Sequence, residues 1–352
     1  MDSTAKEFLH RLLMTPSPSG FEHRIQDVVR EHAGTFADSV RTDSHGNVIV
    51  AVNEKAPIRA MLAGHCDQIG MLICHIDDQG FLYAQTIGGW DPQQLIGQRM
   101  TVWTDTGPIP AVISRKAIHL MEPDERTKGV LEKDLWLDIG ARNGEEAKSL
   151  VRMGDPVTLQ LGYAELRNDC LTSPGTDDKA GLWVVLEAAR RANKSKLKCG
   201  IFAVSTVQEE IGLRGATTAA YGIDPHLGIA VDVTHATDCP TIDIKQRGMV
   251  RLGAGPTLFR GPNVNPRVEN RMREIARMHE IVYQECALGR AAPNDSNALQ
   301  LARAGVATGL VGIPNRYMHS AVEIVNYRDL DRSADLLARF LESVTEEDDW
   351  TP

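Results

Sequence analysis

Apolar and polar positions follow two different periods in the first part of the chain. Residues 3–14 and 22–32 carry apolar side chains at helical spacing, which predicts two amphipathic helices. Residues 39–53 alternate apolar and polar side chains around the turn sequence SHGN, as a β-hairpin does. Residues 58–65, IRAMLAGH, are almost continuously apolar, which is typical of a strand buried on both faces of a mixed sheet.

The pattern changes in the middle of the chain and then changes back. Residues 69–166 consist of short apolar stretches separated by Gly, Asp and Pro turns, such as RMTVWTDTGPIPAVIS, and this pattern favours a small β-barrel or sandwich. Residues 167–352 alternate apolar strands with longer helices. We therefore predict an α/β fold: a mixed central sheet flanked by helices, formed by residues 1–68 and 167–352, with an inserted all-β, barrel-like domain at residues 69–166.

Composition excludes several classes of partner. The 352 residues are 42% apolar and carry a formal net charge of -9, so a basic face for nucleic acid or an anionic membrane is not expected. The six cysteines form no C-x-x-C pair, which favours reduced thiols in a cytoplasmic protein. The first twenty residues lack the pattern of a secretory signal, and no apolar run reaches the length of a membrane span.

Polar residues of metal-binding type follow five apolar stretches. They occur in the sequences HCD, GTDD, VQEE, VDV and MHS, and the residues concerned are His65 with Asp67, Asp177, Glu209 with Glu210, Asp232, and His319. Each alone has an ordinary explanation, such as a polar turn or a helix cap. Together they are expected to meet, because ligands gather beyond the carboxyl ends of the strands in α/β sheets.

Two histidines and three carboxylates suit zinc, cobalt or manganese. Two metal ions would need one carboxylate as a bridge, since five monodentate groups are too few for both ions. Glu209 and Glu210 are adjacent at a strand end and should point in different directions, so that one can bind metal while the other faces the water.

The five motifs, in this order, resemble the tetrahedral, self-compartmentalising (TET-type) two-metal aminopeptidases. That family includes glutamyl and deblocking aminopeptidases, and some members are labelled endoglucanase. The resemblance covers nearly the whole chain and includes the phrases TPSPSGFE, IGGWDPQQLIGQRM and GIPNRYMHSAVE. It implies a metal-dependent aminopeptidase that removes N-terminal residues from short peptides with a free N-terminus.

The resemblance also assigns roles to individual residues. Asp177 would bridge the two metals, with a cis peptide bond to Asp178. The five metal ligands would be His65, Asp177, Glu210, Asp232 and His319. Glu209 would be the catalytic base. Asp67 would hold the imidazole of His65 in place. The inserted domain would build dimers, which would assemble into a hollow tetrahedral dodecamer.

Three departures from the family pattern stand in the sequence. The family usually reads H-M-D-E-I-G where this chain has HCDQIG, so that Cys66 and Gln68 replace Met and Glu. Lys179 replaces an arginine after the aspartate pair, and PNDSNAL around Asp295 replaces a phrase richer in glycine and threonine. We expect altered metal affinity or substrate preference rather than loss of the chemistry.

Three other functions remain open at this point. A deacylase or carboxypeptidase with two metals would use the same ligands. A glycosidase would need two carboxyl groups on either side of a sugar and usually no transition metal. A binding protein could have kept the fold without catalysis. The preferred N-terminal residue cannot be inferred from these motifs.

Overall fold

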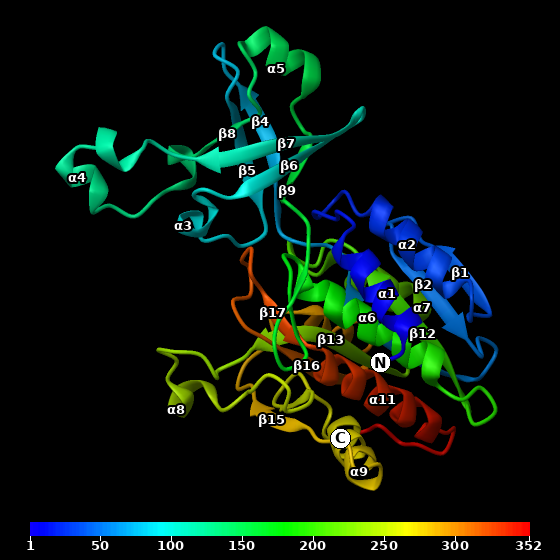
Figure 1. The fold of residues 1–352 in the computed structure, drawn as a ribbon. Coiled ribbons are helices and arrows are strands. Elements are labelled where there is room, and N and C mark those ends of the chain that lie inside the picture. Colours follow the sequence, from blue (N-terminus) through cyan, green and yellow to red (C-terminus); the bar gives the residue numbers. More distant parts are fainter.

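A mixed eight-stranded sheet forms the centre of the molecule in the computed structural model, which describes residues 1–352 (Figure 1). The strand order is β1-β2-β12-β3-β13-β16-β14-β15. The strands are Ser39–Thr42 (β1), Val48–Val52 (β2), Ile58–His65 (β3), Cys199–Thr206 (β12), Leu227–His235 (β13), Thr257–Arg260 (β14), Gln284–Ala287 (β15) and Ala307–Asn315 (β16).

Four neighbouring strands, β12, β3, β13 and β16, run parallel to one another. Their register aligns His65 at the end of β3 with Thr206 at the end of β12. It also aligns Asp232 of β13 with Gly312 of β16. The carboxyl ends of this parallel block therefore meet at one edge of the sheet, and the residues that follow these strands gather there.

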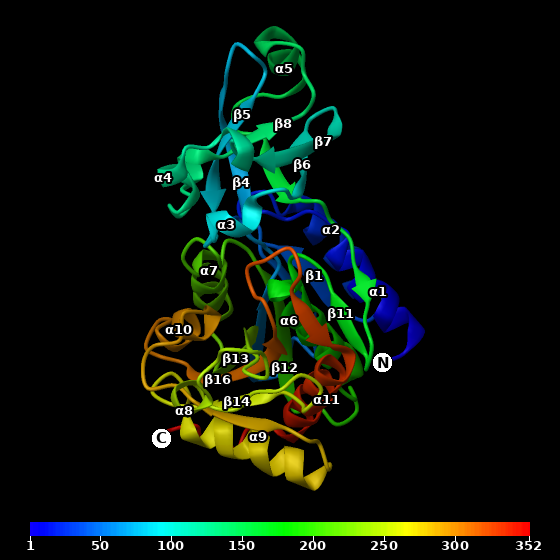
Figure 2. The same ribbon diagram turned by 60° about the vertical axis from the view of Figure 1, so that its left-hand side comes forward.

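Helices cover both faces of the sheet (Figures 1 and 2). The larger apolar core lies under α1 (Ser3–Leu13), α2 (His23–Ala33), α6 (Thr176–Arg191), α9 (Pro266–Met278) and α11 (Tyr327–Ser343). A smaller core on the other face lies under α7 (Arg214–Ile223) and α10 (Asp295–Gln300). A short helix, α8 (Ile244–Arg247), lies in the long connection between β13 and β14.

A separate closed barrel stands on the edge of the α/β body (Figure 1). Its strand order is β4-β5-β8-β7-β6-β9, and it encloses its own apolar core. The strands are Gly70–Ile76 (β4), Leu82–Ile87 (β5), Arg99–Thr104 (β6), Gly107–Ser114 (β7), Trp136–Asp138 (β8) and Pro156–Leu159 (β9). Closure leaves no free sheet edge within the barrel.

Short helical segments lie in the connections between the barrel strands. They are α3 (Pro92–Leu95), η1 (Ile118–Leu120), α4 (Pro123–Arg126), η2 (Glu132–Asp134) and α5 (Gly144–Leu150). Residues 115–135, which join β7 to β8, project from the barrel as an arm that contains α4 (Figure 1). We call this segment the barrel arm.

The predicted fold class is confirmed: an α/β body with a mixed central sheet carries an all-β barrel. The hairpin, the strand at residues 58–65 and the predicted long helices are all present. The prediction missed α7, β14 and β15, together with a third, small sheet. That sheet contains Ala164–Glu165 (β10), Cys170–Thr172 (β11) and Ile324–Asn326 (β17). None of the helices combines the length and apolarity that a bilayer crossing requires.

Candidate metal centre

His65 ends β3 and its side chain is almost completely buried. Its Nδ1 lies 3.0 Å from the backbone carbonyl oxygen of Asp67. A carbonyl only accepts hydrogen bonds, so a neutral His65 carries its proton on Nδ1 and leaves the lone pair of Nε2 free. The strand end thus presents Nε2 to the acidic residues around it.

The carboxylate of Asp67 lies 3.5 Å from Nδ1 of His65, farther away than its own carbonyl oxygen. It accepts hydrogen bonds from the backbone N–H groups of Glu209 (3.0 Å) and Glu210 (3.2 Å), and from the hydroxyl of Ser19 (2.6 Å). Asp67 therefore contacts the imidazole mainly through its backbone, while its carboxylate holds the acidic loop after β12.

Asp177 lies in the first turn of α6, and the predicted cis peptide bond to Asp178 is present. The apolar stretch before Asp177 does contain a strand, but that strand is not part of the central sheet. This strand, β11, pairs with β10 and β17 in the small sheet. The start of α6 lies beside the carboxyl ends of the parallel strands. This position brings Asp177 next to the residues that follow those strands.

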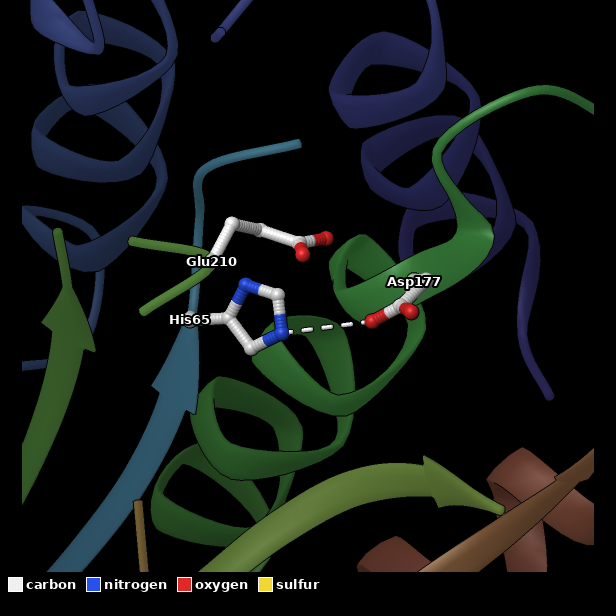
Figure 3. Close-up of side chains that lie close together, drawn as sticks. All are labelled: His65, Asp177 and Glu210. Carbon is white, nitrogen blue, oxygen red and sulfur yellow. Dashed lines mark ion pairs between the residues drawn. The ribbon is translucent and has the colours of Figure 1, made fainter. Parts of the chain in front are cut away.

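The two carboxylate oxygens of Asp177 face two different histidines. Oδ1 lies 3.2 Å from Nε2 of His65, and Oδ2 lies 3.1 Å from Nε2 of His319. Figure 3 shows Asp177 reaching from the start of α6 toward His65 at the end of β3, with Glu210 beside them. One carboxylate thus lies between the two imidazoles, as a bridging ligand would.

Glu209 and Glu210 lie in the loop after β12, and their side chains diverge as predicted. Oε2 of Glu209 lies 3.9 Å from Nε2 of His65, whereas Oε2 of Glu210 lies 3.5 Å from Nε2 of His319. The two carboxylates therefore face opposite ends of the Asp177 carboxylate.

Asp232 faces the same side as Glu209, with Oδ1 3.9 Å from Nε2 of His65. The expectation that Asp232 ends its strand is wrong, because β13 continues in register with β16 as far as His235. The residue opposite Asp232 is Gly312, which adds no side chain beside the carboxylate.

His319 follows β16, which continues through Pro314 as far as Asn315. Nδ1 of His319 lies 2.8 Å from the carbonyl oxygen of Gly89, which follows β5 of the barrel. A neutral His319 therefore also carries its proton on Nδ1 and turns Nε2 toward Asp177 and Glu210. Gly89 was not singled out in the sequence, because its contribution is a backbone carbonyl.

A second contributor that the sequence did not single out is Glu323. Its carboxylate accepts hydrogen bonds from the backbone N–H groups of Asp177 and His319, both at 2.9 Å. The only signal in the sequence was its place four residues after His319, in the phrase MHSAVE.

Burial and neighbouring charges perturb the pKa values in this cluster. Burial opposes ionisation of Asp177, but the imidazoles of His319 and His65, which donate hydrogen bonds from Nε2 when they are protonated, outweigh it and hold the Asp177 pKa below its usual range. Burial raises the pKa of Glu209 well above its usual range, against the opposing influence of His65. Burial also raises the pKa of Asp232, to about 8. Such a concentration of shifted acids is typical of functional sites.

The residues present fit a site for metal cations. Both imidazoles direct Nε2 at carboxylates 3.1–3.9 Å away, and a cation between them would satisfy both sides. Ligand atoms of His65, Asp177 and Glu210 lie within 4.8 Å of one another, as do those of His65, Asp178 and Asp232. Oε1 of Glu210 and Oδ2 of Asp178 are buried without any hydrogen-bond partner.

The cluster opens into a cavity of about 1330 Å³. All the predicted ligands and the predicted base line it: His65, Asp177, Glu209, Glu210, Asp232 and His319. Beyond them the wall includes apolar side chains of β14 and β16, such as Phe259 and Leu310. The volume is sufficient for the first residues of an extended peptide.

Two of the departures from the family pattern contact each other. Nζ of Lys179, which is fully buried, donates hydrogen bonds to Oε1 of Gln68 (2.6 Å) and to the carbonyl oxygen of Thr15 (2.8 Å). Burial lowers the pKa of Lys179 to about 7. Gln68 is thus directed at Lys179, and neither residue lines the cavity.

Comparison with known proteins assigns the family. Residues 46–336 match the family described as M42 glutamyl aminopeptidase. The chain belongs to the M42 aminopeptidase family. A lysyl aminopeptidase of Pyrococcus furiosus is 36% identical to this M42 protein, over 98% of this chain and 99% of the relative. The resemblance to tetrahedral aminopeptidases is confirmed, and the protein is a peptide hydrolase.

Solved structures agree with this assignment. The TET aminopeptidase of a marine-sediment thaumarchaeote has a TM-score of 0.93 to this M42 peptidase at 30% identity, covering 98% of this chain and 97% of that one. The TET1 peptidase of Pyrococcus horikoshii, which can assemble into a tetrahedron or a large octahedral shell, has a TM-score of 0.86 at 28% identity. It covers 97% of this chain and 100% of its own.

Proposed function

We propose that this M42 peptidase is a metal-dependent aminopeptidase with two divalent ions in each subunit, which removes N-terminal residues from short peptides. The observation that carries the proposal is the position of Asp177 between the two histidines, one at 3.2 Å and the other at 3.1 Å. A single carboxylate between two nitrogen ligands is the arrangement that a dinuclear site needs.

The residues divide into two ligand sets that share Asp177. His65 and Asp232 would complete the first set, and Glu210 and His319 would complete the second. Imidazole and carboxylate ligands suit zinc first, and also cobalt or manganese. When bound, such ions acidify a coordinated water and polarise the scissile carbonyl group.

Glu209 is proposed as the catalytic base. It faces the cluster, yet its Oε2 is 3.9 Å from the nearest imidazole nitrogen, which leaves room for a water. Its carboxylate would accept the proton of the attacking water and later deliver it to the leaving amine. A raised pKa favours a carboxyl group that has to hold a proton between these two steps.

The substrate is proposed to be a peptide with a free N-terminus. The α-amino group is a cation at neutral pH, and the inner end of the cavity carries four carboxylates: Asp177, Glu209, Glu210 and Asp232. An unblocked amine therefore fits the inner end, while the rest of the peptide extends along the cavity.

The test is hydrolysis of a panel of aminoacyl-p-nitroanilides by the purified protein, before and after chelator treatment and after zinc, cobalt or manganese is added back. We expect hydrolysis that the chelator abolishes and metal restores, and the panel would rank the N-terminal residues. No release across the panel by protein with measured bound metal would contradict the proposal.

A second assay separates the aminopeptidase from a deacylase or carboxypeptidase. N-acetylation of a cleaved peptide should abolish its hydrolysis, because the acetyl group removes the cationic amine. Continued cleavage of the acetylated peptide would favour a deacylase or carboxypeptidase. Metal-bound protein that cleaves neither peptide would favour a binding protein, and chelator-insensitive cleavage of a glycoside would favour the glycosidase.

Residues 69–166 are proposed as the oligomerisation domain. The barrel is a separately closed unit, and its barrel arm carries exposed apolar side chains. The P. horikoshii relative assembles into closed shells. We expect dimers that assemble into a tetrahedral dodecamer, which mass photometry of the purified protein would detect.

A further inference from the structure

Glu323 is a buried carboxylate in the short loop between β16 and β17, with 1% of its surface exposed. No lysine or arginine lies within 4.0 Å of it, although most buried carboxylates in proteins are paired with a charge. Its hydrogen bonds must therefore offset the cost of its burial.

All three of those hydrogen bonds come from the segments that carry Asp177 and His319. Oε2 accepts from the backbone N–H of Asp177 (2.9 Å) and from the hydroxyl of Thr176 (2.8 Å). Oε1 accepts from the backbone N–H of His319 (2.9 Å). One carboxylate thus joins two chain segments that are more than a hundred residues apart in the sequence.

The contacts around Glu323 determine which groups donate hydrogen bonds to its carboxylate, and they hold its loop closed. The side-chain N–H of Asn315 donates to Oγ1 of Thr176 (3.0 Å), so the hydroxyl proton is free to point at Glu323. Arg316 and Ile324 exchange two backbone hydrogen bonds of 3.0 Å, which close the loop that carries both His319 and Glu323. His319 itself has a φ of +61°, a conformation in which a non-glycine residue needs support from its surroundings.

We propose that Glu323 is a positioning residue for the second metal position, which it serves by holding the backbones of Asp177 and His319 at a fixed separation. Asp177 is shared by both ligand sets, whereas His319 belongs only to the second. Loss of the link should therefore weaken the second metal position more than the first. This inference rests on the proposed dinuclear function.

The discriminating variant is Glu323→Gln, which keeps the size of the side chain. Its amide replaces one acceptor oxygen with an NH₂ group, so in either orientation an N–H of the amide faces a backbone N–H donor of the site. We expect the affinity for the second ion to fall by about 10- to 100-fold, the range found when hydrogen-bond partners of metal ligands are lost. The affinity for the first ion should change by less than about threefold.

The measurement is isothermal titration of Co²⁺ into chelator-treated protein, followed in parallel by the visible absorption of bound cobalt. Activity is not needed for this readout. Asp329→Asn is the matched control, because Asp329 is also a buried carboxylate that accepts two backbone N–H groups, from Gly253 and Gly255, both at 2.7 Å. It lies outside the cavity, and both cobalt affinities should stay at the wild-type value.

Thr176→Val provides a second variant if Glu323→Gln does not fold. It removes the hydroxyl donor to Glu323, together with the acceptor of the Asn315 side-chain N–H, and should weaken the binding of the second ion several-fold. The proposal is overturned if the folded variants bind both ions with wild-type affinities, or if Asp329→Asn lowers the second affinity as much as Glu323→Gln does. A wild-type protein that binds no second ion would instead overturn the proposed dinuclear function.

Discussion

Glu209 and Glu210 are adjacent in the chain but face different histidines. Asp67 accepts hydrogen bonds from both of their backbone N–H groups, so the peptide between them is held while the side chains diverge. Glu210 lies 3.5 Å from the imidazole of His319 and Glu209 lies 3.9 Å from that of His65, and this divergence supports the different chemical roles proposed for the two side chains.

Glu209→Gln tests the division of roles. The amide cannot accept the proton of the attacking water, so we expect kcat to fall by at least about 100-fold, the lower end for loss of general acid–base catalysis. The bound metal, measured by mass spectrometry, should stay near two ions per subunit. Glu210→Gln should instead lower the metal content. Full turnover in Glu209→Gln would show that another group is the base.

Lys179 and Gln68 form a buried pair that a double-mutant cycle can test. Lys179→Met leaves the carbonyl of Thr15 without its donor and leaves the amide oxygen of Gln68 with only the long 3.5 Å contact of the Ser17 hydroxyl. The loss should cost roughly 2–6 kcal/mol, at about 1–3 kcal/mol for each of the two groups. Adding Gln68→Met removes one of these orphaned acceptors. The double variant should therefore be less destabilised than the sum of the single variants.

Denaturant unfolding of the four proteins measures the coupling. A double variant that equals the sum of the single variants would show that the 2.6 Å contact contributes no coupling energy.

Residues that end strands could be predicted from the sequence, whereas residues that support them could not. His65, Glu209 and Glu210 follow long apolar runs, so their meeting at one sheet edge was predictable. Glu323 and Gly89 act through contacts with segments far away in the chain, and Gly89 contributes only a carbonyl oxygen. No local pattern encodes such contacts.

A second cluster of charged residues lies between helices α6 and α2, away from the candidate metal centre. Glu187 of α6 is fully buried and accepts two hydrogen bonds of 2.8 Å from Arg190 and one of 3.1 Å from Arg191. His32 of α2 lies 3.7 Å away. Burial opposes the ionisation of Glu187, but the hydrogen bonds and positive charges of His32, Arg190 and Arg191 outweigh burial. Together they lower the Glu187 pKa from 4.5 to about 2.

Glu187→Gln should therefore destabilise the protein in a pH-dependent way. A depressed pKa stabilises the folded state above pH 4.5, and that contribution is lost as the pH falls through 2. The shift corresponds to about 3 kcal/mol at neutral pH. We expect the thermal midpoint of the variant to lie several degrees below that of the wild type at pH 7, and the gap to narrow below pH 4.5. A gap that stays constant down to pH 3 would contradict this assignment.

The elements that the sequence failed to predict share a physical cause. The sequence of α7, RGATTAAYGI, has small side chains and little apolar contrast, because the helix packs closely against the sheet through Ala219 and Ala220. β14 and β15 are four residues each, too short to show a period. β11 is shorter still, at three residues, so the sequence gives no sign that the strand before Asp177 belongs to a separate sheet.

The barrel and the α/β body meet at the candidate metal centre. The carbonyl of Gly89 from the barrel orients His319 of the body, and the chain enters the barrel directly after the segment with His65 and Asp67. An assembly interface on the barrel would therefore be connected to the candidate metal centre in two ways. The chain runs directly from His65 into the barrel, and the carbonyl of Gly89 forms a hydrogen bond with His319. On the proposed function, the surface of the barrel would determine the oligomeric state separately from the metal ligands.

The barrel arm is the part of that surface to change first. It exposes Ile118 (60%), Leu120 (70%) and Leu131 (55%) on a projecting segment, and such apolar side chains are expected to be covered in an assembly. Ile118→Lys with Leu120→Lys should shift the mass distribution from the dodecamer toward smaller species without changing the thermal midpoint of the fold by more than about 2 °C, since exposed substitutions cost little.

Mass photometry across a dilution series measures the shift. Met278→Lys is the matched control, because Met278 is 73% exposed but lies at the end of α9, on the side of the body away from the barrel (Figure 2). It should leave the assembly intact. An unchanged dodecamer in the double variant would place the assembly contacts outside the barrel arm, because a lysine ammonium group is not buried in an apolar interface without a partner. Loss of the dodecamer in the control would place contacts on the α/β body.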